Sequence, residues 1–192
     1  ISQAISGQLL KIRGITPGHA TWATAVFAAA MLAVLLMGGA QGLLPGALLF
    51  QLASILDGVD GEIARATFRE SPQGARLDSL IDAATNLGFI AGVAVNMFAQ
   101  GDRTSAYAGG IGLIAFAAGL TIIARRNCRR DTGLTFNAVK EHFRARPSRL
   151  MTALTWLTMR DFFALAFAVL IAAGLAAFAL KAFFVVVCGW LL

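Results

Sequence analysis

Residues 43–65 read LLPGALLFQLASILDGVDGEIAR, an apolar run that ends among acidic residues. Similar apolar runs recur along the chain, and about twenty apolar residues are enough for a helix to cross the hydrocarbon core of a bilayer. They predict six spans, at about 19–38, 43–65, 73–98, 105–125, 160–177 and 178–192. The last two are short, and Lys181 separates them only weakly. We therefore expect an all-α, polytopic membrane protein.

The composition excludes a water-soluble domain and a disordered chain. Of the 192 residues, 58% are hydrophobic and 14% are charged, whereas soluble domains average about 45–50% and about 25%. The apolar runs are continuous, and a membrane β-barrel would show alternation instead. The length suits one domain, so residues 1–192 are expected to form a single membrane unit. The start at Ile1 leaves open a soluble domain before residue 1.

The first fifteen residues differ from the spans that follow. Apolar residues recur there at helical spacing, at Ile1, Ile5, Leu9 and Ile12. This pattern predicts an amphipathic helix over 1–15 that lies in the membrane interface. Pro17 fits the first turn of a new helix, so residues 16–192 are expected to form the six-helix transmembrane bundle.

The basic residues predict the orientation of the chain. Fourteen of the 16 Lys and Arg lie in segments 1–16, 65–76 and 125–160, and only Arg103 and Lys181 lie elsewhere. By the positive-inside rule, the N-terminus and the functional site face the cytoplasm, in a prokaryotic inner or plasma membrane. No nucleic-acid-binding motif accompanies the net charge of +6, so nucleic acid is not an expected partner.

Acidic residues inside two neighbouring spans need compensation, because each costs about 2.5–3.5 kcal/mol near the bilayer centre. At about 100° per residue, one face of the second span carries Asp57, Asp60, Gly61 and Ala64. One stripe of the third span carries Gly74, Asp78 and Asp82. The short connection makes the two spans antiparallel neighbours. We therefore expect the four aspartates to meet near the cytoplasmic surface.

Four aspartates in one place predict a metal centre, because like charges at that distance repel one another unless a cation is present. Oxygen ligands without Cys or His favour Mg²⁺ or Mn²⁺ over zinc. Four carboxylates can hold two such ions, an arrangement that clamps a phosphoryl group. The guanidinium of Arg65 suits a diphosphate, although a positive-inside anchor is the alternative. The small residues leave space beside the metals, or serve helix packing instead.

The spacing Asp57-x2-Asp60-Gly61-x2-Ala64-Arg65-x8-Gly74-x3-Asp78-x3-Asp82 resembles the signature of the CDP-alcohol phosphotransferase family at every defined position. The resemblance implies a membrane enzyme, usually a homodimer, that moves a substituted phosphate from a CDP-linked donor to an acceptor hydroxyl and releases CMP. It implies that the four aspartates bind two metal ions and that Asp82 is also the catalytic base. It places the donor against Gly61, Ala64, Arg65, Ser71 and Gly74.

The identity of the two substrates is less constrained. Three arginines flank a basic segment: Arg125, Arg126 and Arg160. They are expected to bind a phosphorylated acceptor. The alternative is that they only set the orientation of the chain in the membrane. Segments 57–65 and 157–167 look most like the di-inositol phosphate phosphate synthase branch, which joins CDP-inositol to inositol phosphate. The alternative is a phospholipid synthase that joins CDP-diacylglycerol to inositol phosphate, glycerol phosphate or another soluble alcohol.

A divalent-cation transporter is a more distant alternative, because carboxylates within a membrane can also mark an ion pathway. Transporter sites usually lie near the bilayer midplane between internal repeats. The predicted aspartate cluster lies toward one end of its spans, and the sequence shows no internal repeat. We therefore expect an enzyme.

Overall fold

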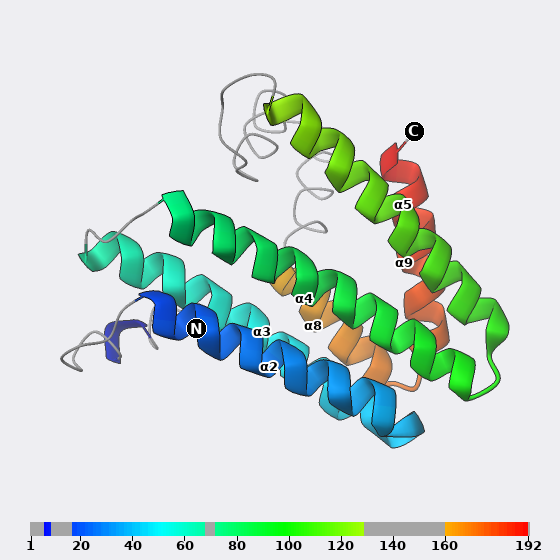
Figure 1. Ribbon diagram of the computed structural model, residues 1–192. Coiled ribbons are helices and arrows are strands. Elements are labelled where there is room, and N and C mark those ends of the chain that lie inside the picture. The colour runs from blue at the N-terminus through cyan, green and yellow to red at the C-terminus, as the bar shows by residue number, and fades with distance from the viewer. Residues whose placement is uncertain (1–5, 9–16, 68–71, 129–159, 192) are drawn as a thin grey trace.

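The computed structural model describes residues 6–8, 17–67, 72–128 and 160–191 of the chain. The long helices in these ranges are α2 (Pro17–Met37), α3 (Gly39–Thr67), α4 (Pro72–Ala99), α5 (Arg103–Cys128), α8 (Arg160–Ala172) and α9 (Ala176–Leu191). The described residues contain no strand. The predicted all-α class is thus confirmed for this part of the chain (Figure 1).

Within the residues that the structure describes, three helical segments are long and apolar enough to cross a membrane: Gly18–Met37, Gly39–Ala64 and Gln73–Ala99. They coincide with the spans predicted at 19–38, 43–65 and 73–98. The two C-terminal helices contain shorter apolar stretches, Phe162–Ala172 and Ala176–Gly189. Membrane crossing by α5, α8 and α9 stays a prediction. Of the interfacial helix predicted over 1–15, the structure describes only residues 6–8, which form one helical turn.

The turn between α2 and α3 is tighter than the sequence suggested. α2 begins at Pro17, as predicted, but only Gly38 separates it from α3, where the predicted spans left residues 39–42 between them. The next residue, Gly39, has a φ of +53°, a conformation that suits glycine because it has no Cβ. The Asn96 amide of α4 donates to the carbonyls of Leu35 (2.6 Å) and Gly39 (2.8 Å) and so holds this turn.

The boundary predicted between the last two spans is wrong. α8 ends at Ala172 and α9 begins at Ala176, so Lys181 lies inside α9 and does not separate the helices. Gly174 has a φ of +73°, and its N–H donates to the Ile171 carbonyl while that of Leu175 donates to the Leu170 carbonyl. These two hydrogen bonds form a Schellman cap. The break therefore depends on a glycine conformation and not on a charge.

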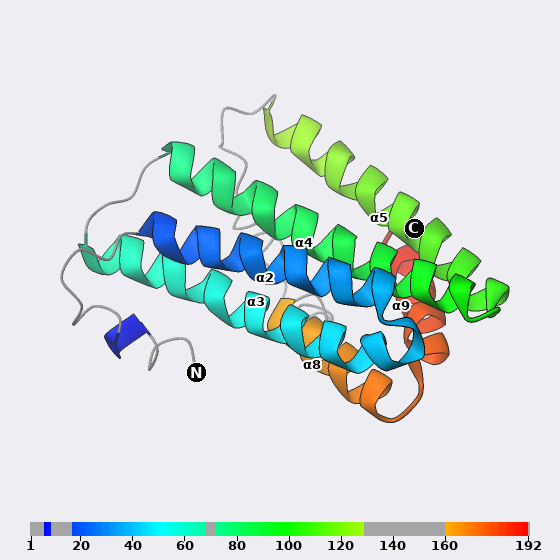
Figure 2. The same ribbon diagram turned by 60° about the horizontal axis from the view of Figure 1, so that its bottom comes forward.

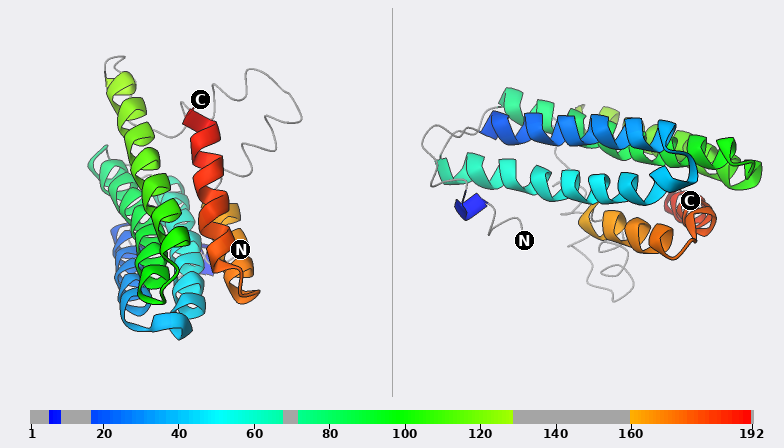
Figure 3. Two further views of the ribbon diagram at one scale, coloured as in Figure 1. Left: turned by 90° about the vertical axis from the view of Figure 1, so that its right-hand side faces the viewer. Right: turned by 90° about the horizontal axis from the view of Figure 1, so that it is seen from below.

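The helices pack as two connected groups. α2, α3 and α4 pack on one another and α8 packs on α3, while α5 packs on α4 and α9 (Figures 2 and 3). Phenylalanines join both groups. Phe50 of α3 and Phe89 of α4 are fully buried and stack with ring centroids 4.1 Å apart and an interplanar angle of 5°. The cluster continues through Phe163, Phe167, Phe183 and Phe116.

Loss of one ring from this stack is expected to destabilise the fold. Phe89→Ala removes the partner of Phe50 and leaves a cavity, and buried Phe→Ala changes cost about 3–5 kcal/mol in soluble proteins. Phe98→Ala on the same helix is the matched control, because Phe98 is 48% exposed. We expect a clearly lower melting temperature in detergent for Phe89→Ala alone. Equal melting temperatures for the two variants would contradict the importance of the stack.

Candidate active site

The phenylalanine stack shows how α3 and α4, which carry the predicted acidic stripes, are aligned along their axes. Asp57 follows Phe50 by seven residues, and Asp82 precedes Phe89 by seven residues. Seven residues are nearly two helical turns, so each aspartate lies on the same face as its phenylalanine, about 10.5 Å along the axis. Because α3 and α4 run in opposite directions (Figure 1), the stack and this spacing predict that Asp57 and Asp82 lie at the same level.

The structure describes the side chains of three of the four predicted metal ligands and only the backbone of the fourth. The side chains of Asp57, Asp78 and Asp82 are partly buried, and Oδ1 of Asp57 is shielded from solvent. For Asp60 only the backbone within α3 is described. Among the described side chains, no three His, Cys, Asp or Glu residues are close enough together to hold a metal ion. That set does not include Asp60, so the convergence of all four aspartates stays a prediction.

The chemistry of the donors nevertheless suits a hard divalent ion. The facing stripes offer carboxylate oxygens from two helices, and neither stripe carries His or Cys. Mg²⁺ and Mn²⁺ prefer oxygen ligands of this kind. The partial burial of the three described aspartates also keeps their charges in surroundings where a cation would be strongly attracted.

Asp82 has a neighbour that the sequence analysis missed. The Nδ2 amide of Asn86 donates to Oδ1 of Asp82 (2.8 Å) and to the backbone carbonyl of Asp82 (2.9 Å). Residues four apart lie on the same helical face, so Asn86 continues the stripe formed by Asp78 and Asp82. This spacing could have identified Asn86 from the sequence, because it places an amide donor one helical turn after a predicted site carboxylate.

Glu62 also has a role that was not predicted. The Ser6 hydroxyl donates to Oε2 of Glu62 at 2.5 Å, and Ser6 is 4% exposed. The contact joins the N-terminal turn, residues 6–8, to α3 between two residues of the acidic motif, Gly61 and Ala64. Residues 6–8 therefore lie beside the part of α3 that carries the acidic motif, toward the end of that helix (Figure 2).

The remaining predicted site residues are placed only in part. Gly61 and Ala64 are partly buried in α3, and Gly74 is exposed near the start of α4. The side chains of the predicted arginines, Arg65, Arg125, Arg126 and Arg160, lie outside the described set, as does Ser71 altogether. The backbones of Arg125 and Arg126 are in the last turn of α5, and Arg160 is the first residue of α8. Donor and acceptor contacts of these residues stay predictions.

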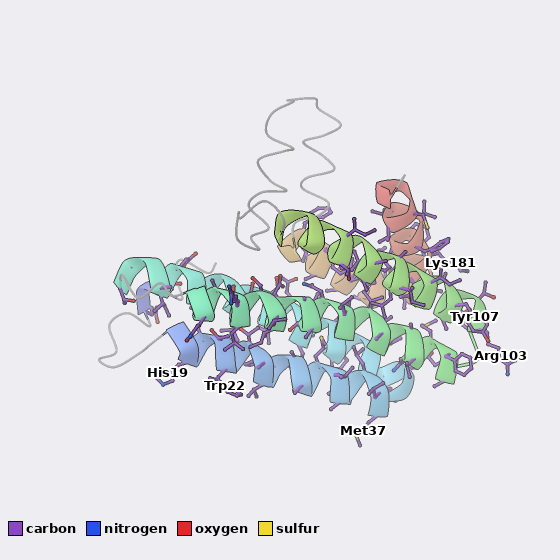
Figure 4. The ribbon with its side chains drawn as sticks, turned by 45° about the horizontal axis from the view of Figure 1, so that its top comes forward. His19, Trp22, Met37, Arg103, Tyr107 and Lys181 are labelled. Atoms are coloured by element: carbon purple, nitrogen blue, oxygen red, sulfur yellow. The ribbon has the colours of Figure 1, made fainter. Side chains whose placement is uncertain are left out.

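The opposite end of the molecule carries Arg103 and Lys181. Figure 4 shows both, together with Tyr107, at the end away from His19. These are the two basic residues that the charge pattern assigned to the outer face. Asp102 caps α5 there by accepting a hydrogen bond from the Ser105 N–H (3.1 Å). The structure thus separates this end from the acidic motif by the length of the helices.

Comparison with known proteins gives a family match across almost the whole chain. The model of the CDP-alcohol phosphatidyltransferase family matches residues 14–190. A protein of Rubrobacter xylanophilus named bifunctional IPC transferase and DIPP synthase is 43% identical over 83 residues, which are 43% of this chain and 18% of that protein.

Proteins of the same name from two other organisms match shorter stretches. The one from Aquifex aeolicus is 42% identical over 52 residues, 27% of this chain and 12% of that protein. The one from Thermococcus kodakarensis is 50% identical over 44 residues, 23% of this chain and 10% of that protein. Each of these matches spans less than a fifth of the relative's length.

Proposed function

Because the chain belongs to the CDP-alcohol phosphatidyltransferase family, we propose that it transfers a substituted phosphate from a CDP-linked alcohol to an acceptor hydroxyl and releases CMP. The observation that carries the proposal is the stack of Phe50 on Phe89, which supports the expectation that Asp57 and Asp82 lie at one level of α3 and α4. The family assignment also favours an enzyme over the cation transporter considered from the sequence.

The four aspartates, Asp57, Asp60, Asp78 and Asp82, would hold two Mg²⁺ or Mn²⁺ ions. Such ions, when bound, neutralise the diphosphate of the donor and stabilise the departing phosphate. Asp82 is the proposed base, which takes the proton of the acceptor hydroxyl. Its partial burial and its bond with Asn86 support this role, because a base must be held in a fixed position relative to the proton it removes.

The donor would bind along the α3–α4 connection. Arg65 would hold the donor phosphates through its planar pair of N–H donors. Gly61, Ala64 and Gly74 would leave space for cytidine, with Ser71 beside the nucleotide. What supports this placement is that all five residues lie within or next to the two helix ends that carry the aspartates.

For the substrates we propose CDP-inositol as donor and inositol phosphate as acceptor, giving di-inositol phosphate phosphate. The names of the relatives, which include DIPP synthase, support this pair. The alternative is a phospholipid synthase that uses CDP-diacylglycerol. Purified protein offered both donors, each with inositol phosphate and with glycerol phosphate, should release CMP only from CDP-inositol with inositol phosphate. Release from CDP-diacylglycerol would contradict the proposed substrates and leave the reaction class standing.

The acceptor phosphate is proposed to bind at Arg125, Arg126 and Arg160. Replacement of each by Gln removes a charged, bidentate phosphate donor, and we expect the acceptor KM to rise about tenfold while the donor KM changes little. Arg103→Gln is the matched control, since Arg103 lies at the other end of α5. Unchanged acceptor kinetics in all three variants would remove this part of the proposal.

We also propose that the protein is a homodimer in the membrane, with the N-terminus and the α3–α4 connection facing the cytoplasm. The distribution of charge supports the orientation, because the two basic residues assigned to the outer face lie together at the end opposite His19 (Figure 4). We expect a protease added to the cytoplasmic side of membrane vesicles to cleave the N-terminus, whereas cleavage from the opposite side alone would contradict this orientation.

A further inference from the structure

The Asn86 amide makes two different hydrogen bonds with one residue. Its Nδ2 donates to the carbonyl of Asp82 at 2.9 Å and to Oδ1 of the Asp82 carboxylate at 2.8 Å. Both partners can only accept, and the Asn86 oxygen cannot donate, so the orientation of the amide is determined by its surroundings. One carboxylate oxygen of Asp82 is therefore held against α4.

We propose that Asn86 is a positioning residue: by donating to Oδ1, it fixes the Asp82 carboxylate in one rotamer. The inference rests on the proposed function, in which Asp82 is both ligand and base. An aspartate on a helix can adopt several side-chain rotamers. A second-sphere donor that selects one rotamer keeps the ligand in place before the ion arrives.

The bond to the carboxylate is what distinguishes Asn86 from other polar residues on these helices. Thr67, Ser79, Thr85 and Thr121 each donate to the carbonyl four residues earlier, a common local bond in helices. Asn86 makes that bond as well, but it alone among these residues also donates to an acidic side chain. Asn96, on the same helix, donates to two backbone carbonyls and provides a structural comparison.

This difference gives a variant that separates the two bonds. Asn86→Ser keeps a hydroxyl that can donate to the Asp82 carbonyl, as Ser79 does to the carbonyl of Ala75. The serine side chain is too short to donate to the Asp82 carboxylate as well. Asn86→Leu removes both bonds and keeps the same branching of the side chain. Asn96→Ser is the matched control, because it weakens a structural amide about 15 Å farther along α4.

The test measures Mn²⁺ binding to the purified full chain without substrates, with the electron paramagnetic resonance signal of free Mn²⁺ as the readout. In parallel, kcat is measured at several Mn²⁺ concentrations. We expect both Asn86 variants to bind Mn²⁺ at least about tenfold more weakly, as for other changes to residues that hydrogen-bond metal ligands. Added Mn²⁺ should restore part of their kcat. Asn96→Ser should lower the melting temperature and leave Mn²⁺ affinity unchanged.

Two results would overturn the inference, and they are distinguishable. If Asn86→Ser binds Mn²⁺ and turns over like the wild type, the bond to the carboxylate has no positioning role, whatever Asn86→Leu does to stability. If the wild-type chain itself neither binds Mn²⁺ nor releases CMP with any donor, the proposed function fails, and the role of Asn86 fails with it.

Discussion

Asp82→Asn is expected to reduce CMP release at least about a thousandfold. The change keeps the size of the side chain but removes the negative charge that would bind metal and accept the acceptor's proton, and general-base catalysis alone contributes about 10²–10⁴-fold. The loss should appear in kcat at saturating substrates and metal. The measurement is CMP release by the purified protein.

Asp102→Asn is the control for this experiment, because it makes the same chemical change at the opposite end of the molecule. Asp102 caps α5 through the Ser105 N–H, and an asparagine oxygen can accept the same bond. We therefore expect its activity and melting temperature to stay close to those of the wild type. If Asp82→Asn retained a tenth or more of the wild-type kcat, Asp82 would not be the base.

Asp57→Asn, Asp60→Asn and Asp78→Asn, made singly, are each expected to lower activity at least about a hundredfold, because each removes a metal ligand in the proposed site. Changes that only disturb the surroundings of a metal typically cost about 10–100-fold, so direct loss of a ligand should cost at least as much. Raised Mg²⁺ should recover part of the activity. Asp102→Asn is again the control, because it makes the same Asp-to-Asn change away from the proposed site and should leave activity unchanged.

These three variants, together with Asp82→Asn, distinguish a shared metal centre from independent carboxylates. The stack of Phe50 on Phe89 predicts that Asp57 and Asp82 lie at one level, so loss of either should weaken the same ions. Full activity in two or more of the four aspartate variants would contradict the metal centre. Unchanged melting temperatures would show that the losses do not come from unfolding.

The sequence predicted the positions of α2, α3 and α4 to within a few residues, because a long apolar run has few alternatives to a membrane helix. It did not predict the turns. The α2–α3 reversal and the α8–α9 break both depend on a positive φ, at Gly39 and at Gly174. With 20 glycines in the chain, composition does not show which of them take that conformation.

For the site, helical periodicity predicted the stripes, and the structure supplied their relative level. The 100° rule places Asp57 on one stripe and Asp82 on another, but it gives no information on how far α3 slides along α4. The stack of Phe50 on Phe89 fixes that distance, and a contact between residues 39 positions apart is not visible in local spacing. Asn86 was not among the predicted site residues, although its spacing of four residues from Asp82 was visible in the sequence.

Equilibrium binding of Mn²⁺ to the purified wild-type chain tests the central claim most directly, since the claim is that carboxylates from α3 and α4 gather around hard cations. Two bound Mn²⁺ per chain are predicted, displaced by Mg²⁺, with binding lost or strongly weakened in Asp57→Asn and in Asp82→Asn and kept in Asp102→Asn. Failure to bind Mn²⁺, or binding that neither variant alters, would contradict the claim.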